Sequence, residues 1–285
     1  MRNNSTIKIG NYFEIGNNKP FFLMAGPCQA ESLDHSLFMA ESIKKICDKL
    51  SINYVFKASF DKANRTSVSS KRGVGLEEGM RIFEQIKKQI GIPTITDVHL
   101  PEQASIIAET CDILQVPAFL CRQSDLLEAI AKTKKPIHVK KMQQLAPWTM
   151  ESVVKKINSF GNSDVILCDR GTAFGYGSLV VDMRALPIMA QWAPVAIDCT
   201  HACQLPGGKT TAGNRDMALV IASAAMAVGV SGVFAEVHDN PPVAPSDAAN
   251  MIYLDKLEKF LYRLTLLDKI AKENPIEIEN YNILA

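Results

Sequence analysis

No apolar run in the sequence approaches the roughly 20 residues that a membrane-spanning helix needs. Residues 1–5 also lack the continuous apolar segment of a secretory signal peptide. Charge of one sign is not in excess either, because 31 basic residues stand against 30 acidic ones. We therefore expect neither nucleic acid nor a membrane as a partner, and any anion-binding site has to be local.

A disulfide framework is missing as well. The seven cysteines are odd in number and scattered, and Cys111, Cys168 and Cys199 lie inside apolar runs. Such usage is typical of a reducing compartment, so we expect a cytoplasmic protein. No linker, low-complexity stretch or shift in composition divides the chain, so residues 1–285 are expected to form one domain.

What the sequence does contain is a regular alternation of short apolar runs and amphipathic stretches. We predict a β-hairpin within residues 1–20 and then eight strand–helix units. The predicted strands are residues 21–25, 54–58, 92–96, 113–116, 137–139, 165–168, 195–199 and 232–235. The predicted helices are one capped by Ser32 and then residues 77–90, 101–110, 124–132, 150–160, 179–191, 215–228 and 253–273.

The strands are apolar on both faces, as parallel strands covered by helices are. Eight such units favour an α/β fold of the (β/α)₈ TIM-barrel type, with residues 1–20 as a hairpin extension and residues 275–285 as a C-terminal tail. An open, doubly wound sheet is the alternative. It predicts a glycine-rich turn after an early strand, and no GxGxxG motif stands there.

A polar or reactive residue stands at the end of each predicted strand or shortly after it. In a barrel these ends converge on one face and build the site. The eight residues are Cys28, Lys57, Asp97, Gln115, Lys140, Arg170, His201 and Glu236. Each has an ordinary structural explanation by itself, for example Cys28 as a small buried filler. Eight residues at equivalent positions favour a functional site.

Two chemical subsets separate among the candidate residues. The cations Lys57, Lys62, Arg65, Lys140 and Arg170 are numerous enough for two phosphates and a carboxylate. The second subset offers one soft, one borderline and two hard metal ligands, which suit Zn²⁺, Fe²⁺ or Mn²⁺. It consists of Cys28, His201, Glu236 and Asp247. Three further histidines rank lower as ligands, namely His238, His99 and His138.

Six motifs resemble the family of 3-deoxy-D-manno-octulosonate 8-phosphate synthases. They are KASFDKANRTS from Lys57, RGVGLEEG from Arg72, TDVH from Thr96, QVPAFL from Gln115, CDRGTAFGY from Cys168 and DCTH from Asp198. The resemblance runs from about residue 21 to residue 260. It implies a (β/α)₈ barrel assembled as a homotetramer. It also implies condensation of phosphoenolpyruvate with arabinose 5-phosphate, with release of phosphate, for the lipopolysaccharide core.

The resemblance also implies roles for single residues. The catalytic positions are Lys57, Lys62, Asp97 and His201. The positions for phosphoenolpyruvate are Lys57, Ser59, Lys62, Gln115, Ala118, Lys140 and Arg170. Asn64 and Asp97 correspond to contacts with the sugar near its reacting end. Arg65 and Thr66 match a pair that binds the sugar phosphate across a subunit boundary, where serine is commoner than threonine.

The metal requirement divides the family into two branches. Cysteine in the Ala-Gly-Pro-Cys turn, present here at Cys28, is typical of the metal-dependent branch, whereas the other branch has asparagine. The resemblance thus implies that Cys28, His201, Glu236 and Asp247 hold a divalent zinc, iron, manganese or cobalt ion. Two segments differ from the common pattern or vary in length, the loop 141–145 and a glycine-rich lid at 204–215.

Three other functions stay open. The sister enzyme uses erythrose 4-phosphate, and proline in place of Asn64 would have favoured it. A Schiff-base aldolase needs a lysine with a depressed pKa, and we expect none because anions surround the lysines. A catalytically inactive phosphosugar-binding protein would lack a ligand or a cation, and none is missing from the sequence.

Overall fold

The computed structural model describes residues 2–65, 71–205 and 212–278. Within them eight parallel strands close into a barrel, since each strand pairs with the next and β14 pairs with β3. The strands are β3 (Phe22–Gly26), β4 (Asn53–Lys57), β5 (Thr94–Asp97), β6 (Ile113–Val116), β7 (Ile137–Lys140), β8 (Val165–Asp169), β11 (Val195–Asp198) and β14 (Gly232–His238). The predicted (β/α)₈ barrel is confirmed.

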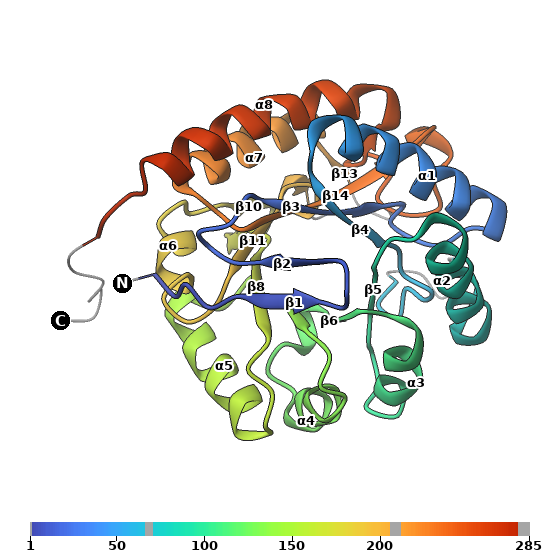
Figure 1. Ribbon diagram of the computed structural model, residues 1–285, viewed down its shortest axis with the longest axis horizontal. Coiled ribbons are helices and arrows are strands. Elements are labelled where there is room, and N and C mark those ends of the chain that lie inside the picture. The colour runs from blue at the N-terminus through green and yellow to red at the C-terminus, as the bar shows by residue number, and fades with distance from the viewer. Residues whose placement is uncertain (1, 66–70, 206–211, 279–285) are drawn as a thin grey trace.

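Helices surround the barrel (Figure 1). They are α1 (Leu33–Leu50), α2 (Leu76–Ile90), α3 (Gln103–Thr110), α4 (Ser124–Lys132), α5 (Met150–Ser159), α6 (Ala185–Met189), α7 (Asp216–Val228) and α8 (Leu254–Glu273). Ser32 caps α1 as predicted, because its side chain accepts a hydrogen bond from the backbone N–H of His35. No helix of the described segments is both long and apolar enough to cross a membrane.

The predicted N-terminal hairpin is confirmed as β1 (Ile7–Ile9) and β2 (Phe13–Ile15), and it lies across the middle of the ring of helices in Figure 1. Its three isoleucines are buried in one cluster with inward-facing barrel residues such as Phe22 and Phe234. The hairpin therefore plugs the amino-terminal end of the barrel. The polar strand ends are left at the opposite end, where sites of this fold lie.

The helix predicted at residues 179–191 is wrong over most of its length. β9 (Thr172–Phe174) and β10 (Ser178–Val180) form an antiparallel hairpin instead, and only Ala185–Met189 is helical. Gly175, which adopts a φ of +63°, lies in the turn between these strands. Pro187 falls within the first turn of α6, where its missing N–H costs no hydrogen bond.

Two other differences concern the site. The strand predicted at residues 232–235 extends to His238, so Glu236 lies within β14 and not after it. The predicted lid begins and ends in a small antiparallel pair, β12 (Gln204–Leu205) and β13 (Ala212–Gly213). The part of the lid between them, residues 206–211, lies outside the described residues, as do residues 279–285 of the predicted tail.

Candidate active site

The polar strand ends gather at the open end of the barrel, as the sequence predicts. Lys57, Asp97 and Lys140 are the last residues of β4, β5 and β7, and Gln115 is the last but one of β6. All four side chains are buried, and so is Arg170 just after β8. Five polar residues, four of them charged, are thus buried together at the carboxyl end of the barrel strands.

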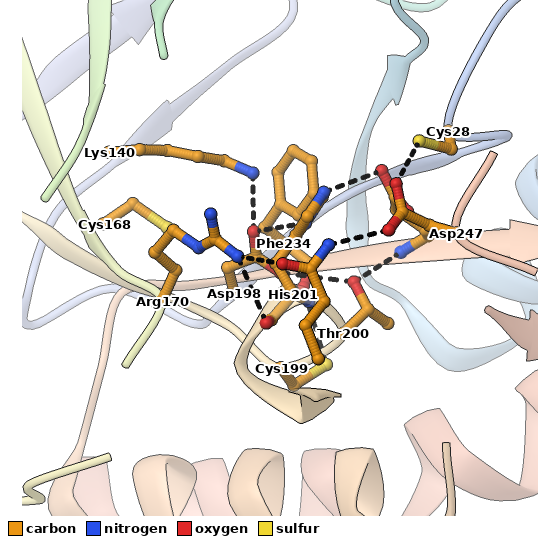
Figure 2. A network of polar contacts seen from close by, with 12 residues as sticks. Cys28, Lys140, Cys168, Arg170, Asp198, Cys199, Thr200, His201, Phe234 and Asp247 are labelled. Atoms are coloured by element: carbon orange, nitrogen blue, oxygen red, sulfur yellow. Dashed lines mark hydrogen bonds and ion pairs between the residues drawn. The ribbon is translucent and has the colours of Figure 1, made fainter. Parts of the chain in front are cut away.

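The four predicted metal ligands come together. Single ligand atoms of Cys28, His201, Glu236 and Asp247 all lie within 4.8 Å of one another. Cys28 Sγ is 3.3 Å from an Asp247 carboxylate oxygen, and His201 Nε2 is 3.2 Å from Glu236 Oε1. Figure 2 shows Cys28, His201 and Asp247 converging from separate segments.

The strand pairing explains how residues distant in sequence meet. β3 and β14 are neighbours with Gly26 opposite Glu236, which brings the Cys28 turn beside that carboxylate. Only glycine fits at position 26, because an added Cβ would lie 2.1 Å from the carbonyl oxygen of Lys57. His201 follows β11, the other neighbour of β14.

The chemistry of these four side chains fits a divalent metal. Glu236 is buried and its carboxylate oxygens make no hydrogen bond among the described residues, although His201 Nε2 approaches one of them to 3.2 Å. A buried carboxylate without hydrogen bonds is costly unless a cation compensates it. Burial and the charge of Glu236 hold the pKa of the Cys28 thiol well above its usual value. A bound cation acts in the opposite direction, since it favours the thiolate.

Asp198 supports His201 from behind, and sequence reasoning missed it as a site residue. Its carboxylate lies 2.7 Å from His201 Nδ1, so the imidazole presents Nε2 to the ligand group. The same carboxylate accepts a hydrogen bond of 2.5 Å from Lys140 Nζ. Burial opposes its charge, but His201 and Lys140 hold the pKa of Asp198 well below its usual range. Its place at the end of β11 is the signal that could have revealed it.

Gln204 links the candidate cations to the candidate metal ligands, and it too was missed. Its amide oxygen accepts a hydrogen bond from Arg170, and its amide nitrogen donates to Asp247 Oδ1 over 2.7 Å. Arg170 also donates to the carbonyl oxygen of His201 over 3.3 Å (Figure 2). Gln204 lies in β12 at the start of the predicted lid, where nothing in its neighbours signals this role.

Two lysines converge on one hydroxyl. Ser59 Oγ accepts hydrogen bonds from Lys57 Nζ over 3.0 Å and from Lys62 Nζ over 2.9 Å. Burial and the charge of Lys62 lower the pKa of Lys57. The expectation that no lysine here has a depressed pKa is therefore wrong for Lys57. Burial opposes the charge of Lys62 as well, but Cys28, Glu236 and Asp97 outweigh it and raise the pKa of Lys62.

Phe234 forms an aromatic floor under the cations. The ammonium of Lys140 lies 3.5 Å from its ring centroid and that of Lys57 lies 5.3 Å from it. His138 stacks on the ring with an interplanar angle of 6° and contacts the Gln115 amide oxygen over 3.2 Å. In the sequence Phe234 is one apolar residue of a strand, so its contact with the cations could not be foreseen.

The model of the DAHP synthetase I family matches residues 4–273, nearly the whole chain. The chain belongs to this family. The 2-dehydro-3-deoxyphosphooctonate aldolase of Bartonella henselae is 51% identical over 273 residues, 95% of this chain and 98% of that protein. The protein of the same name from Brucella ovis is 50% identical over 272 residues, 94% of this chain and 98% of the relative. These matches confirm the resemblance inferred from the motifs.

In this DAHP synthetase I family member, the candidate substrate-binding residues Arg65, Asn64 and Ala118 lie at the edge of the same barrel end. Arg65 donates hydrogen bonds to the Gln29 amide oxygen over 2.8 Å and to Ser246 Oγ over 3.0 Å. Asn64 is exposed, Ala118 is buried at the start of a 3₁₀ turn, and Thr66 lies outside the described residues.

His99 and His238, the weaker metal-ligand candidates, both lie outside the group of four ligands. His99 contacts Asp97 Oδ2 through Nε2 over 2.9 Å. Burial opposes the charge of Asp97, but Lys57 and His99 hold its pKa well below the usual range. His238 lies away from the four ligands, in a group with Glu31 and His35.

Proposed function

We propose that this protein is a metal-dependent 3-deoxy-D-manno-octulosonate 8-phosphate synthase. It condenses phosphoenolpyruvate with D-arabinose 5-phosphate and releases inorganic phosphate, in the cytoplasm, for the lipopolysaccharide core. One observation carries the proposal. Buried cations and a group of candidate metal ligands that includes a cysteine lie together at the same end of the barrel. Relatives at about half identity are named 2-dehydro-3-deoxyphosphooctonate aldolase, a name for the same eight-carbon phosphorylated product.

The reaction joins the methylene carbon of phosphoenolpyruvate to the aldehyde carbon of the open-chain sugar. Water adds to the neighbouring carbon of phosphoenolpyruvate, and its C–O bond to phosphate then breaks. Both substrates are anions, so the site has to overcome their repulsion and hold the two carbons close together. Buried cations at fixed positions meet this requirement.

The cations are assigned to phosphoenolpyruvate. Lys62, Lys140 and Arg170 bind its carboxylate and phosphate, while Lys57, Ser59, Gln115 and Ala118 line it. The depressed pKa of Lys57 supports this assignment, because two ammonium groups on one hydroxyl repel each other until an anion binds. Phe234 places the cations without neutralising them, since its ring carries no net charge.

The sugar is assigned to the rim of the barrel end. Asn64 and Asp97 contact it near its reacting end, and Arg65 with Thr66 binds its phosphate in a homotetramer, across a subunit boundary. Arg65 is suited to connect the sugar phosphate to the candidate metal centre, because it bonds to Ser246 beside the candidate ligand Asp247.

The metal is assigned to Cys28, His201, Glu236 and Asp247. These four residues would hold a divalent ion, and its positive charge would serve to polarise the sugar aldehyde or to lower the pKa of a water molecule. His201 keeps Nε2 turned to the ligand group because Asp198 lies behind Nδ1. Asp198 also holds Lys140, so one carboxylate positions both halves of the site.

A Schiff-base aldolase is the second candidate, and the depressed pKa of Lys57 is the observation that favours it. The two mechanisms differ in a covalent intermediate. Borohydride in the presence of substrate traps a lysine adduct only in the Schiff-base mechanism. We expect no adduct at Lys57, because its ammonium already donates to Ser59 between charged neighbours.

Phosphate release in the presence of each sugar tests the proposed function. The amide of Asn64, lying between Lys62 and Arg65, is expected to bond a hydroxyl that the shorter sugar cannot present, a difference on the order of 1–3 kcal/mol. We expect kcat/KM for arabinose 5-phosphate to exceed that for erythrose 4-phosphate about tenfold or more. In the same assay, Asn64→Ala is expected to reduce the ratio of kcat/KM for arabinose 5-phosphate to kcat/KM for erythrose 4-phosphate. Equal use of both sugars by the unmodified enzyme, or no phosphate release with either, contradicts the proposal.

A further inference from the structure

Two histidines and two carboxylates form a second group, separate from the candidate metal centre. Glu31 lies in the loop before α1, His35 in the first turn of α1, His238 at the end of β14 and Asp239 directly after it. Single ligand atoms of Glu31, His35 and His238 lie within 4.8 Å of one another. The imidazole centroids of the two histidines are 4.8 Å apart. None of these residues has a role in the proposed condensation.

The carboxylates divide the four imidazole nitrogens into two sets. Asp239 Oδ1 lies 3.0 Å from His35 Nε2 and also 3.0 Å from His238 Nδ1. The other two nitrogens face Glu31 Oε1, with His35 Nδ1 at 3.9 Å and His238 Nε2 at 2.7 Å. Histidines that bind a metal through one nitrogen commonly donate the other N–H to a carboxylate, which fixes the ring. Asp239 is placed to do so for both rings.

His35 provides an independent sign that the group can take a cation. Its Nδ1 is buried, and no hydrogen-bond partner for it exists in the described part of the chain. The nearest carboxylate oxygen, at 3.9 Å, is too far for a hydrogen bond. In the neutral imidazole whose Nε2 donates to Asp239, Nδ1 carries a lone pair that faces Glu31, and a cation between the two would satisfy both.

We propose that Glu31, His35 and His238 form a second divalent-metal site, supported by Asp239. Two imidazoles and one carboxylate are a common zinc ligand set, and it leaves a fourth position open. Metal–ligand bonds of about 2.0–2.1 Å in a tetrahedron separate the ligand atoms by about 3.3 Å. The distances of 2.7 and 3.9 Å from Glu31 bracket that value, so small side-chain rotations suffice. The partly exposed Glu31 and Asp239 provide the route of entry.

Metal binding here requires one proton to move. The backbone N–H of Asn240 points at His238 Nδ1 over 2.9 Å, so in the free protein the ring proton is on Nε2 and is donated to Glu31. When the cation takes Nε2, this proton passes to Nδ1 and is donated to Asp239, and the Asn240 N–H has to give up its hydrogen bond to Nδ1. The charges of Glu31 and Asp239 compensate the cation.

Cobalt(II) titration of the metal-stripped protein distinguishes the two sites. A thiolate ligand produces a charge-transfer band in the near ultraviolet, whereas imidazole and carboxylate ligands contribute only visible d–d bands. We expect the unmodified chain to bind two molar equivalents of cobalt(II). The charge-transfer band should reach its full intensity after the first equivalent. His35→Gln should bind only one equivalent of cobalt(II) and should still show the charge-transfer band. Cys28→Ala should lose the charge-transfer band and should still bind one equivalent of cobalt(II), at the site that contains His35.

Asp34→Asn is the matched control, because Asp34 is an exposed carboxylate next to His35 but outside the group. It should bind two equivalents, as the unmodified chain does. Circular dichroism of the metal-free proteins verifies folding, and Glu31→Gln replaces His35→Gln if that variant does not fold. Binding of a single equivalent by the unmodified chain, or of two by both His35→Gln and Glu31→Gln, overturns the proposal. Neither result bears on the Cys28 centre, which is followed by its own band.

Discussion

Lys140 donates a hydrogen bond of 2.5 Å to Asp198, and the two side chains are buried at the ends of β7 and β11, on either side of β8. Asp198 also lies 2.7 Å from the imidazole of His201. One carboxylate therefore sets the position of a candidate substrate-binding cation and of a candidate metal ligand. The two halves of the site are coupled, and a change at Asp198 has to affect both.

Asp198→Asn is expected to weaken metal binding and to destabilise the protein, because the carboxylate holds both His201 and Lys140. Loss of the carboxylate behind a ligating histidine lowers metal affinity by roughly 10–100-fold. It also leaves Lys140 buried without its partner, which costs on the order of 3–5 kcal/mol of stability. Competition with a chromophoric chelator measures the first effect, and urea unfolding the second. Asp182→Asn, which removes an exposed partner of Arg184, is the control and should change neither. Unchanged metal affinity in Asp198→Asn would refute the coupling.

Cys28→Ala is expected to lose most bound metal and most turnover while the protein still folds, because the buried thiol lies in a bend at the barrel end and belongs to neither apolar cluster of the core. Metal analysis after purification without chelator measures the loss. Cys28→Asn is the informative companion, since asparagine stands at this position in the metal-independent branch, and we expect it to retain some activity in excess chelator. Full activity of the metal-stripped unmodified enzyme would show instead that Cys28 has only a packing role.

Arg65→Ala is expected to raise the KM for arabinose 5-phosphate far more than the KM for phosphoenolpyruvate, because Arg65 lies at the rim and Arg170 lies deeper beside His201. Loss of a charged hydrogen-bond donor to phosphate costs about 1.5–3 kcal/mol, or roughly 10-fold to 150-fold. Steady-state kinetics with each substrate varied in turn separate the two constants.

Subunit mixing tests whether Arg65 acts across a boundary. If it does, combining Arg65→Ala with Arg170→Ala restores activity in hybrid oligomers, because some sites then receive both intact residues. Subunit exchange is verified by light scattering and by mixing tagged with untagged protein. A fully active monomer would rule out any role in a neighbouring subunit.

His138 is expected to make the protein less stable as the pH falls below neutrality. Burial, aided by Lys140, lowers the pKa of His138 from 6.5 to about 3. Between these values the unfolded chain binds a proton that the folded chain does not, so the free energy of unfolding decreases as the pH falls. The contribution of one such group is about 1.4 kcal/mol per pH unit.

Urea unfolding at several pH values between 4 and 7 measures this slope. In His138→Asn the group is absent, so the variant should lose less stability on acidification than the unmodified protein, whatever its stability at neutral pH. Parallel slopes in the two proteins would mean that His138 is protonated in the folded state as well.

Much of the fold could be read from local patterns. The strand at residues 113–116 and the helix at 124–132 have the predicted bounds, since apolar periodicity and flanking breakers define both. The helix predicted at 179–191 shows the limit of such patterns. Apolar residues at 179–181 are compatible with a helix and with a strand. Pairing with β9 stabilises the strand β10 there.

The sequence by itself determined the barrel and the meeting of Cys28, His201 and Glu236, because every strand ends in a chemically distinctive residue and a closed barrel must bring all eight ends together. The fourth candidate ligand, Asp247, lies in the loop after β14, and the path of that loop places it. Only the tertiary structure decided that Asp198 joins Lys140 to His201, that Phe234 lies beneath two ammonium groups, and that His35 and His238 face one carboxylate. Periodicity tells which side of an element is buried. Which side chains meet across the barrel depends on strand register and loop path, and these follow from packing of the whole chain.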